Sequence, residues 1–184
     1  MVLTESTMPA LGTPAPDFVL PEPDTNRKWA LDDFREEAMV VVFTCNHCPY
    51  AQAVEDRIIA LARQFQNKVD FVAISANDVD NFPDDAPGKM AQRAREKGYP
   101  FPYLYDESQA VAQAYGAACT PDFFLYGPER ELAYRGRLDD NWKEPENVQC
   151  QDLRDAIDAV LAGKPAAEPQ MAAIGCNIKW KEEK

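Results

Sequence analysis

The sequence has little positive charge, a single histidine and no long apolar run, and each shortage excludes a class of protein. Its 184 residues include 19 lysines and arginines against 31 aspartates and glutamates, which gives a formal net charge of −12. A chain with this charge repels phosphate backbones and anionic membrane surfaces. The longest apolar run, residues 38–43, is far too short to span a bilayer. We therefore expect neither a nucleic-acid partner nor a membrane partner.

The beginning of the chain also lacks the features of a secretory signal. No basic residue precedes Arg27, and the same stretch contains no long apolar segment. We therefore expect a cytoplasmic protein. In a reducing compartment the five cysteines, at positions 45, 48, 119, 150 and 176, do not form a structural disulfide framework. Cysteines that lie close together in such a protein are typically catalytic or metal-binding.

The apolar pattern predicts an alternation of strands and helices. Residues 38–44 and 69–75 are apolar and β-branched without alternation, which is typical of strands buried on both faces. Apolar residues at helical spacing predict a helix over 49–66, so these three segments form a parallel βαβ unit. Residues 122–127 and 131–137 flank a turn and predict an antiparallel hairpin.

The remaining segments complete one predicted domain, 1–184, because this length is typical of a single core. Residues 1–16 are an N-terminal extension expected to run over the surface, and 163–184 are a C-terminal linker and tail. The other predicted elements are short strands at 17–20 and 28–31, a polar loop at 77–88, and helices at 89–97, 108–115 and 153–161.

Two cysteines with a histidine between them follow the first buried strand, in the stretch TCNHCPY at 44–50. A structural zinc site needs four ligands, usually as two pairs at short spacing. The other cysteines are isolated from one another, and His47 is the only histidine. We therefore expect no metal and no other cofactor.

The same stretch meets the requirements of a redox site. Cys45 is expected to be exposed at the end of the strand, where the helix N-terminus stabilises a thiolate. His47, when protonated, lowers the thiol pKa further. Cys48 lies one turn on, shielded by the helix. In the predicted chemistry the Cys45 thiolate attacks a disulfide and Cys48 resolves the mixed disulfide. The expected partners are a protein or small-molecule disulfide and a thiol reductant or reductase.

A Cys-x-x-Cys at a strand-to-helix junction in this element order is typical of thioredoxins. The chain also resembles thioredoxin-like proteins of the AhpC/TSA superfamily, in their bacterial peroxiredoxin-like branch. Four of the segments that carry this resemblance are APDFVL (15–20), VVVFTCNHCPY (40–50), YGAACTPDFFLY (115–126) and IGCNIKWK (174–181). The resemblance implies a thioredoxin fold, with three α/β/α layers, a mixed central sheet, an added N-terminal strand, a helical insertion and a C-terminal tail.

The resemblance also implies a substrate site opposite the cysteines. Pro121 is expected to be a cis-proline facing the active centre, with Thr120 beside Cys45. Their loop should offer backbone groups to an extended substrate strand. Thr44, directly before Cys45, is included in this predicted substrate site.

Departures from the family pattern leave two alternatives open. Thioredoxins have a buried aspartate six residues before the first cysteine, where this chain has Met39, so Asp122 or water is expected to carry the proton. A thiol peroxidase is one alternative, with Arg135 and Arg137 as candidates to polarise a peroxide, although the P-x-x-x-T-x-x-C peroxidase pattern is missing. The other alternative is a non-enzymatic thiol redox sensor.

Two further cysteines are candidates for additional redox thiols. Cys119 lies two residues before Pro121 and is equally well explained as a buried small hydrophobic residue. Cys176 lies in an apolar part of the tail, so it either acts as a further thiol or pins the tail to the core. The physiological substrate, the electron donor and the oligomeric state stay open.

Overall fold

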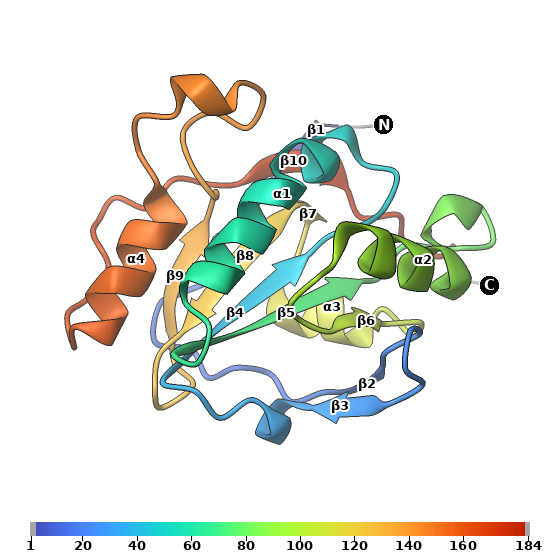
Figure 1. The fold of residues 1–184 in the computed structure, drawn as a ribbon, viewed down its shortest axis with the longest axis horizontal. Helices are drawn as coiled ribbons and strands as arrows, with labels where there is room; N and C mark the ends of the chain where they lie inside the picture. Colours follow the sequence, from blue (N-terminus) through green and yellow to red (C-terminus); the bar gives the residue numbers. More distant parts are fainter. Residues whose placement is uncertain (1–2, 183–184) are drawn as a thin grey trace.

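A five-stranded mixed sheet forms the centre of the computed structural model, which describes residues 3–182 (Figure 1). Residues 1–2 and 183–184, at the outer ends of the predicted extension and tail, lie outside the described residues. The strand order is β6-β5-β4-β8-β9. The strands are β4 (Ala38–Phe43), β5 (Val69–Ser75), β6 (Tyr103–Tyr105), β8 (Asp122–Tyr126) and β9 (Leu132–Gly136). β4, β5 and β6 are parallel, β8 is antiparallel to β4, and β9 is antiparallel to β8. The predicted βαβ unit and hairpin are confirmed.

Every residue of the central strand β4 is buried, because other elements cover both faces of the sheet. Successive side chains of a strand point to opposite faces. Ala38, Val40 and Val42 pack in the core formed with α1 (Pro49–Gln64) and α4 (Asp152–Leu161). The intervening residues of β4 pack in a second core with α3 (Ala110–Tyr115) and with the hairpin of β2 (Val19–Pro21) and β3 (Lys28–Ala30). The three-layer α/β/α arrangement is as predicted.

A second sheet, of three strands, lies next to the first and brings together strands from near the two ends of the chain (Figure 1). It has the order β1 (Leu3–Glu5), β10 (Ile174–Asn177) and β7 (Cys119–Thr120), with antiparallel pairing throughout. Neither β1 nor β10 was predicted. Both are short, and their pairing depends on contacts between distant parts of the chain rather than on a local pattern. The C-terminal tail is therefore part of a sheet.

The helical insertion is α2 (Pro87–Lys97), which begins two residues before the predicted start because proline fits the first turn of a helix. It ends as predicted at Gly98, which has φ 64°. Arg93 forms a bidentate pair with the buried Glu55 of α1, and Tyr99 donates a hydrogen bond to the same carboxylate at 2.6 Å. These contacts hold the insertion against α1.

The smaller elements differ slightly from the prediction. α3 begins at Ala110 and not at Ser108, because Gln109 has φ 64° and the Asp106 carboxylate accepts the N–H of Ala112 at 2.9 Å. Short 3-10 turns occupy Leu31–Asp33, Pro83–Asp85 and Pro145–Asn147. Within residues 3–182, no helix has both the length and the apolar character needed to cross a bilayer.

Candidate active site

Cys45 and Cys48 lie where β4 leads into α1, as predicted, and their side chains hydrogen-bond to each other. Cys48 is the residue before the helix, and Pro49 is its first residue. Both cysteines are buried, with 4% of Cys45 and 0% of Cys48 exposed. The prediction that Cys45 is exposed was wrong, since Ala51 and Cys176 pack around the pair.

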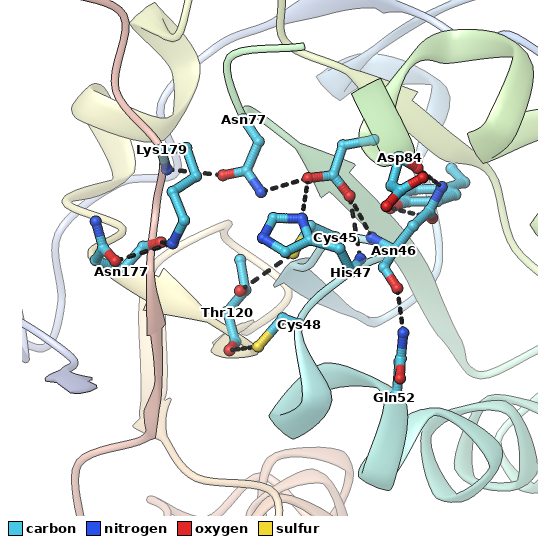
Figure 2. A network of polar contacts seen from close by, with 12 residues as sticks. Cys45, Asn46, His47, Cys48, Gln52, Asn77, Asp84, Thr120, Asn177 and Lys179 are labelled. Atoms are coloured by element: carbon cyan, nitrogen blue, oxygen red, sulfur yellow. Dashed lines mark hydrogen bonds and ion pairs between the residues drawn. The ribbon is translucent and has the colours of Figure 1, made fainter. Parts of the chain in front are cut away.

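Thr120 lies opposite the two cysteines and contacts both (Figure 2). Its hydroxyl is 3.4 Å from Sγ of Cys45, and its backbone oxygen is 3.0 Å from Sγ of Cys48. The Thr120–Pro121 peptide bond is cis, as predicted. The edge predicted to bind a substrate strand is occupied, however, because β10 pairs with Cys119 and Thr120. That part of the prediction was wrong.

The two thiols share one proton, and its position differs from the prediction. Their mutual hydrogen bond raises the pKa of Cys45 well above its ordinary value, and burial and the charge of Asp85 act in the same direction. The same hydrogen bond lowers the pKa of Cys48 to about 4. Burial opposes this shift, but hydrogen bonds from Cys176, Thr120 and the N–H of Ala51 add to it. The shifts therefore make Cys48, at the helix N-terminus, the more acidic of the two thiols, and when protonated it donates to the Thr120 backbone oxygen.

His47 is held by a carboxylate that the sequence analysis did not single out. Its Nδ1 lies 2.6 Å from Oδ2 of Asp85, a fully buried residue of the 3-10 turn Pro83–Asp85 that precedes α2. The ring also stacks on Phe82, with centroids 5.4 Å apart. The hydrogen bond to Asp85 raises the pKa of His47. This direction favours the protonated imidazole, and a ring nitrogen of His47 lies within 4.8 Å of Sγ of Cys45.

Asp85 is itself held by a set of hydrogen bonds. Its Oδ1 accepts the backbone N–H groups of Asn46 and His47, at 2.7 and 3.2 Å. Its Oδ2 accepts Nδ2 of Asn77 at 2.8 Å. Burial opposes ionisation, but the hydrogen bonds from His47 and Asn77 outweigh it and lower the pKa of Asp85. Asp85 thus orients the whole Asn46–His47 segment.

Asn46, inside the Cys-x-x-Cys, clamps the motif to the insertion and to the sheet. Its side-chain amide donates to the backbone oxygen of Asp84 at 2.8 Å and accepts the hydroxyl of Tyr103 at 3.2 Å. Gln52 donates to its backbone oxygen at 2.6 Å. Asn46 therefore holds the Cys-x-x-Cys segment in position through these hydrogen bonds. The motif alone did not predict this role.

Three donor atoms, one each from Cys45, His47 and Asp85, lie within 4.8 Å of one another. The number of cysteines and histidines in the sequence gave no sign of the third donor, the carboxylate of Asp85. Each oxygen of Asp85 nevertheless already accepts two hydrogen bonds, one of which comes from His47 itself. A cation would have to displace them, so the set fits a hydrogen-bonded support better than a metal site.

Asp122, the expected proton carrier, is not part of this network. Burial raises its pKa to about 7, and its carboxylate accepts the N–H of Ala118 at 3.2 Å. Its charge acts on the thiol of Cys119, whereas the carboxylate that acts on Cys45 is Asp85. The structure therefore offers Asp85 rather than Asp122 as the acidic residue of the site.

The remaining predicted residues lie outside the pair's immediate contacts. Thr44 lines a small internal cavity beneath α1, which gives no support to its predicted substrate contact. Arg135 donates to Pro9 and Gln170, and Arg137 donates to Asp152, so both guanidinium groups already have partners. These partners hold both arginines in structural roles and give no support to a role in polarising peroxide.

Cys119 and Cys176 both lie near the pair, but in different surroundings. Burial raises the pKa of Cys119, and its sulfur faces the backbone oxygens of Pro121 and Ala173 at 3.6 and 3.9 Å. This supports its interpretation as a buried small residue. Cys176 instead hydrogen-bonds to Cys48.

Two hollows flank the motif. One, of about 290 Å³, is mainly apolar and is lined in part by Pro121, Trp142 and Ile174. The other, of about 280 Å³, is polar and is lined in part by His47 and Lys89. Both are large enough for a small organic molecule, although neither Cys45 nor Cys48 lines them.

The sheet order, the Cys-x-x-Cys at the start of α1 and the cis-proline opposite it define a redox protein of thioredoxin fold. The AhpC/TSA family model matches residues 11–135, so the chain belongs to the AhpC/TSA family. No curated protein sequence matches the chain significantly.

Solved structures agree with this assignment. An uncharacterized conserved protein from Geobacillus kaustophilus is 44% identical, with a TM-score of 0.94, and covers 100% of this chain and 99% of its own. A hypothetical protein from Sinorhizobium meliloti is 42% identical, with a TM-score of 0.91. The match covers 98% of this chain and 100% of that protein. A thiol:disulfide interchange protein from Chlorobium tepidum shares the fold at 15% identity, with a TM-score of 0.62. The match covers 83% of this chain and 99% of that protein.

Proposed function

We propose that the protein is a cytoplasmic thiol–disulfide oxidoreductase in which Cys45 and Cys48 alternate between dithiol and disulfide. The observation that carries this proposal is the hydrogen-bonded pair of thiols at the N-terminus of α1, with Thr120 in contact with both sulfurs. Such a pair supplies both the attacking and the resolving thiol of disulfide exchange.

Cys45 is the proposed nucleophile, although Cys48 has the lower pKa of the two. Cys45 is the only one of the two with any exposed surface. Transfer of the shared proton along their hydrogen bond gives the Cys45 thiolate, which the Thr120 hydroxyl can stabilise by donating a hydrogen bond. The thiolate attacks one sulfur of the substrate and releases the other as a thiolate. Cys48 gives its proton to this departing thiolate, then attacks Cys45 and releases the second substrate sulfur as a thiolate.

His47 and Asp85 act as positioning residues in this scheme. The imidazolium and the thiolate attract each other, and this attraction contributes to the raised pKa of His47. Asp85 holds the ring through Nδ1 and the peptide N–H groups before it. The imidazolium compensates a negative charge on the thiol pair in a buried site, where an uncompensated charge would be costly, and Asp85 fixes the position of the ring.

A small disulfide is the proposed substrate. β10 occupies the backbone edge that a peptide substrate would need for strand addition. The mainly apolar hollow of about 290 Å³ beside Pro121 is large enough for a low-molecular-weight organic disulfide. A second thiol compound or a reductase would then return the pair to the dithiol.

Single substitutions of the two cysteines test the proposal, with reduction of hydroxyethyl disulfide as the assay. Cys45→Ser should lose most of its turnover, because only the fully buried Cys48 remains to attack the substrate. Cys48→Ser should lose turnover and accumulate a mixed disulfide on Cys45, visible by intact mass. Cys150→Ser, at an exposed position, is the matched control and should keep wild-type activity. Wild-type turnover by Cys45→Ser would overturn the proposal.

Family membership makes thiol peroxidase the second candidate. A peroxidase would consume hydrogen peroxide rapidly in the reduced form and pass through a sulfenic acid. The oxidoreductase predicts fast oxidation by disulfides and slow oxidation by peroxide. A sensor would instead reduce hydroxyethyl disulfide no faster than a free thiol does.

A further inference from the structure

The C-terminal strand places a third cysteine directly on the redox pair. Cys176 is the register partner of Thr120, whose backbone oxygen lies 3.0 Å from Sγ of Cys48. This approach is tight: a Cβ added to Gly175 would lie 2.1 Å from the backbone oxygen of Thr120. Because a larger residue at 175 would not fit, β10 is held close to the site and does not merely pass over it.

The three sulfur-bearing residues form one buried cluster. Cys45, Cys48, Ala51 and Cys176 pack together, and only 2% of Cys176 is exposed. Cys48 hydrogen-bonds to Cys45 on one side and to Cys176 on the other. Cys48 is therefore the central sulfur, which is the position that disulfide exchange between two flanking thiols requires.

The far end of β10 is anchored to the same network that supports His47. The backbone N–H of Lys179 donates to Oδ1 of Asn77 at 2.8 Å, and Nδ2 of Asn77 donates to Asp85 (Figure 2). The backbone oxygen of Lys179 accepts from Asp78 and from Gln109. Cys176 thus lies between two anchored points of the tail, at Gly175 and at Lys179.

We propose that Cys176 is a third redox thiol, which receives the disulfide from the Cys45–Cys48 pair. The Cys176 thiol attacks Sγ of Cys48 in the Cys45–Cys48 disulfide. The Cys48–Cys176 bond forms, the Cys45–Cys48 bond breaks, and the proton lost by Cys176 goes to the released sulfur of Cys45. One thiol and one disulfide are present before and after the step, so no external oxidant or reductant is needed. The exchange starts from the Cys45–Cys48 disulfide and therefore rests on the function proposed above.

The exchange has a measurable consequence because it regenerates Cys45 without a resolving partner. A second disulfide molecule can then modify Cys45, and the adduct persists since Cys48 is bound to Cys176. Without Cys176, the Cys45–Cys48 disulfide is the end point and holds no adduct.

The test uses the full chain in a Cys150→Ser background, which removes the exposed thiol. The reduced protein is treated with excess hydroxyethyl disulfide, quenched in acid, alkylated after denaturation and mapped by mass spectrometry. We expect a Cys48–Cys176 disulfide together with one mercaptoethanol adduct on Cys45. Cys176→Ser should instead give Cys45–Cys48 without an adduct. Cys119→Ser, a matched change at the other buried cysteine of this sheet, should behave like its parent.

A further variant separates the relay from the function of the pair. In Cys45→Ser, excess disulfide should still join Cys48 to Cys176, because the two thiols are in contact. A Cys45–Cys48 disulfide with normal turnover, but with Cys176 fully alkylated in every sample, would overturn the relay and leave the oxidoreductase intact. Absence of any Cys45–Cys48 disulfide in Cys176→Ser would instead contradict the proposed function.

Discussion

At the residue scale, the site depends on one charge shared by two thiols and balanced by one imidazolium. The pKa shifts of the two cysteines are opposite to what the motif suggests. The pKa of Cys48 is lowered, and that of Cys45 is raised. The main cause is the hydrogen bond from Cys45 to Cys48, to which the N–H of Ala51 in the first turn of α1 adds a smaller contribution. Cys45 is the proposed nucleophile because it has the exposed surface, whereas Cys48 is the thiol with the lowered pKa. The two properties therefore belong to different residues.

Replacing Asp85 with asparagine should change the titration of His47. The carboxylate accepts Nδ1–H and raises the pKa of His47, so Asp85→Asn should lower that pKa toward its ordinary 6.5. Since the chain has a single histidine, one imidazole NMR signal reports the titration without ambiguity. Asp84→Asn, at the exposed neighbour, is the control and should leave the pKa unchanged. An unchanged titration in Asp85→Asn would contradict the assigned partner.

The same substitution should alter stability in a defined pH window. The raised pKa of His47 contributes stability that is complete below pH 6.5 and is lost as the pH rises through the folded-state pKa. The lowered pKa of Asp85 contributes stability that is complete above pH 3.8 and is lost as the pH falls through its folded-state value. The difference in unfolding free energy between wild type and Asp85→Asn should therefore be largest between pH 3.8 and 6.5. Urea denaturation across this range measures it.

Much of the site could be predicted from the sequence because its central residues are contiguous or carry a recognisable signature. Cys45, His47 and Cys48 form one motif, and Pro121 follows a threonine before a strand. Asp85 could not be predicted, because its role depends on how a polar loop folds back over the motif. The burial of Cys45 was missed for a related reason, since Cys176, which packs against it, is far away in the sequence.

At the element scale, β10 is the segment that most changes the interpretation of the site. It pairs with β7 on one edge and β1 on the other, and it covers the edge where a substrate strand was expected. Long apolar strands and the amphipathic α1 were predictable because their patterns are local. The strands β1, β6 and β10 have only three or four residues, and each is defined by long-range pairing.

Adding one methyl group to β10 should loosen it. In Gly175→Ala, the new Cβ would lie 2.1 Å from a backbone oxygen of β7, so the strand must shift. We expect a loss of about 2 kcal/mol in unfolding free energy and faster alkylation of Cys176 in the native protein. Gly88→Ala, whose Cβ would meet nothing within 4 Å, is the matched control and should raise stability by about 0.4–1 kcal/mol. Equal stability of the two variants would contradict the tight packing.

At the scale of the whole molecule, the net charge of −12 should select among disulfides. Repulsion lowers the local concentration of anionic substrates, and salt screens this effect. Oxidised glutathione should therefore react faster as ionic strength rises, by roughly two- to tenfold. Cationic cystamine should slow down, and neutral hydroxyethyl disulfide should change little. Stopped-flow rates at several salt concentrations decide this, and identical salt dependence for all three would show that net charge has no influence.

The central claim is that one disulfide reaction passes through Cys45 and ends on Cys48. The most direct measurement is a single turnover of the reduced protein with one equivalent of hydroxyethyl disulfide, quenched in acid at successive times and mapped by mass spectrometry. The account predicts a mercaptoethanol adduct on Cys45 first, followed by a Cys45–Cys48 disulfide as the adduct disappears. An adduct that forms first on Cys48, or a Cys45 adduct that persists without forming a disulfide to Cys48, would contradict it.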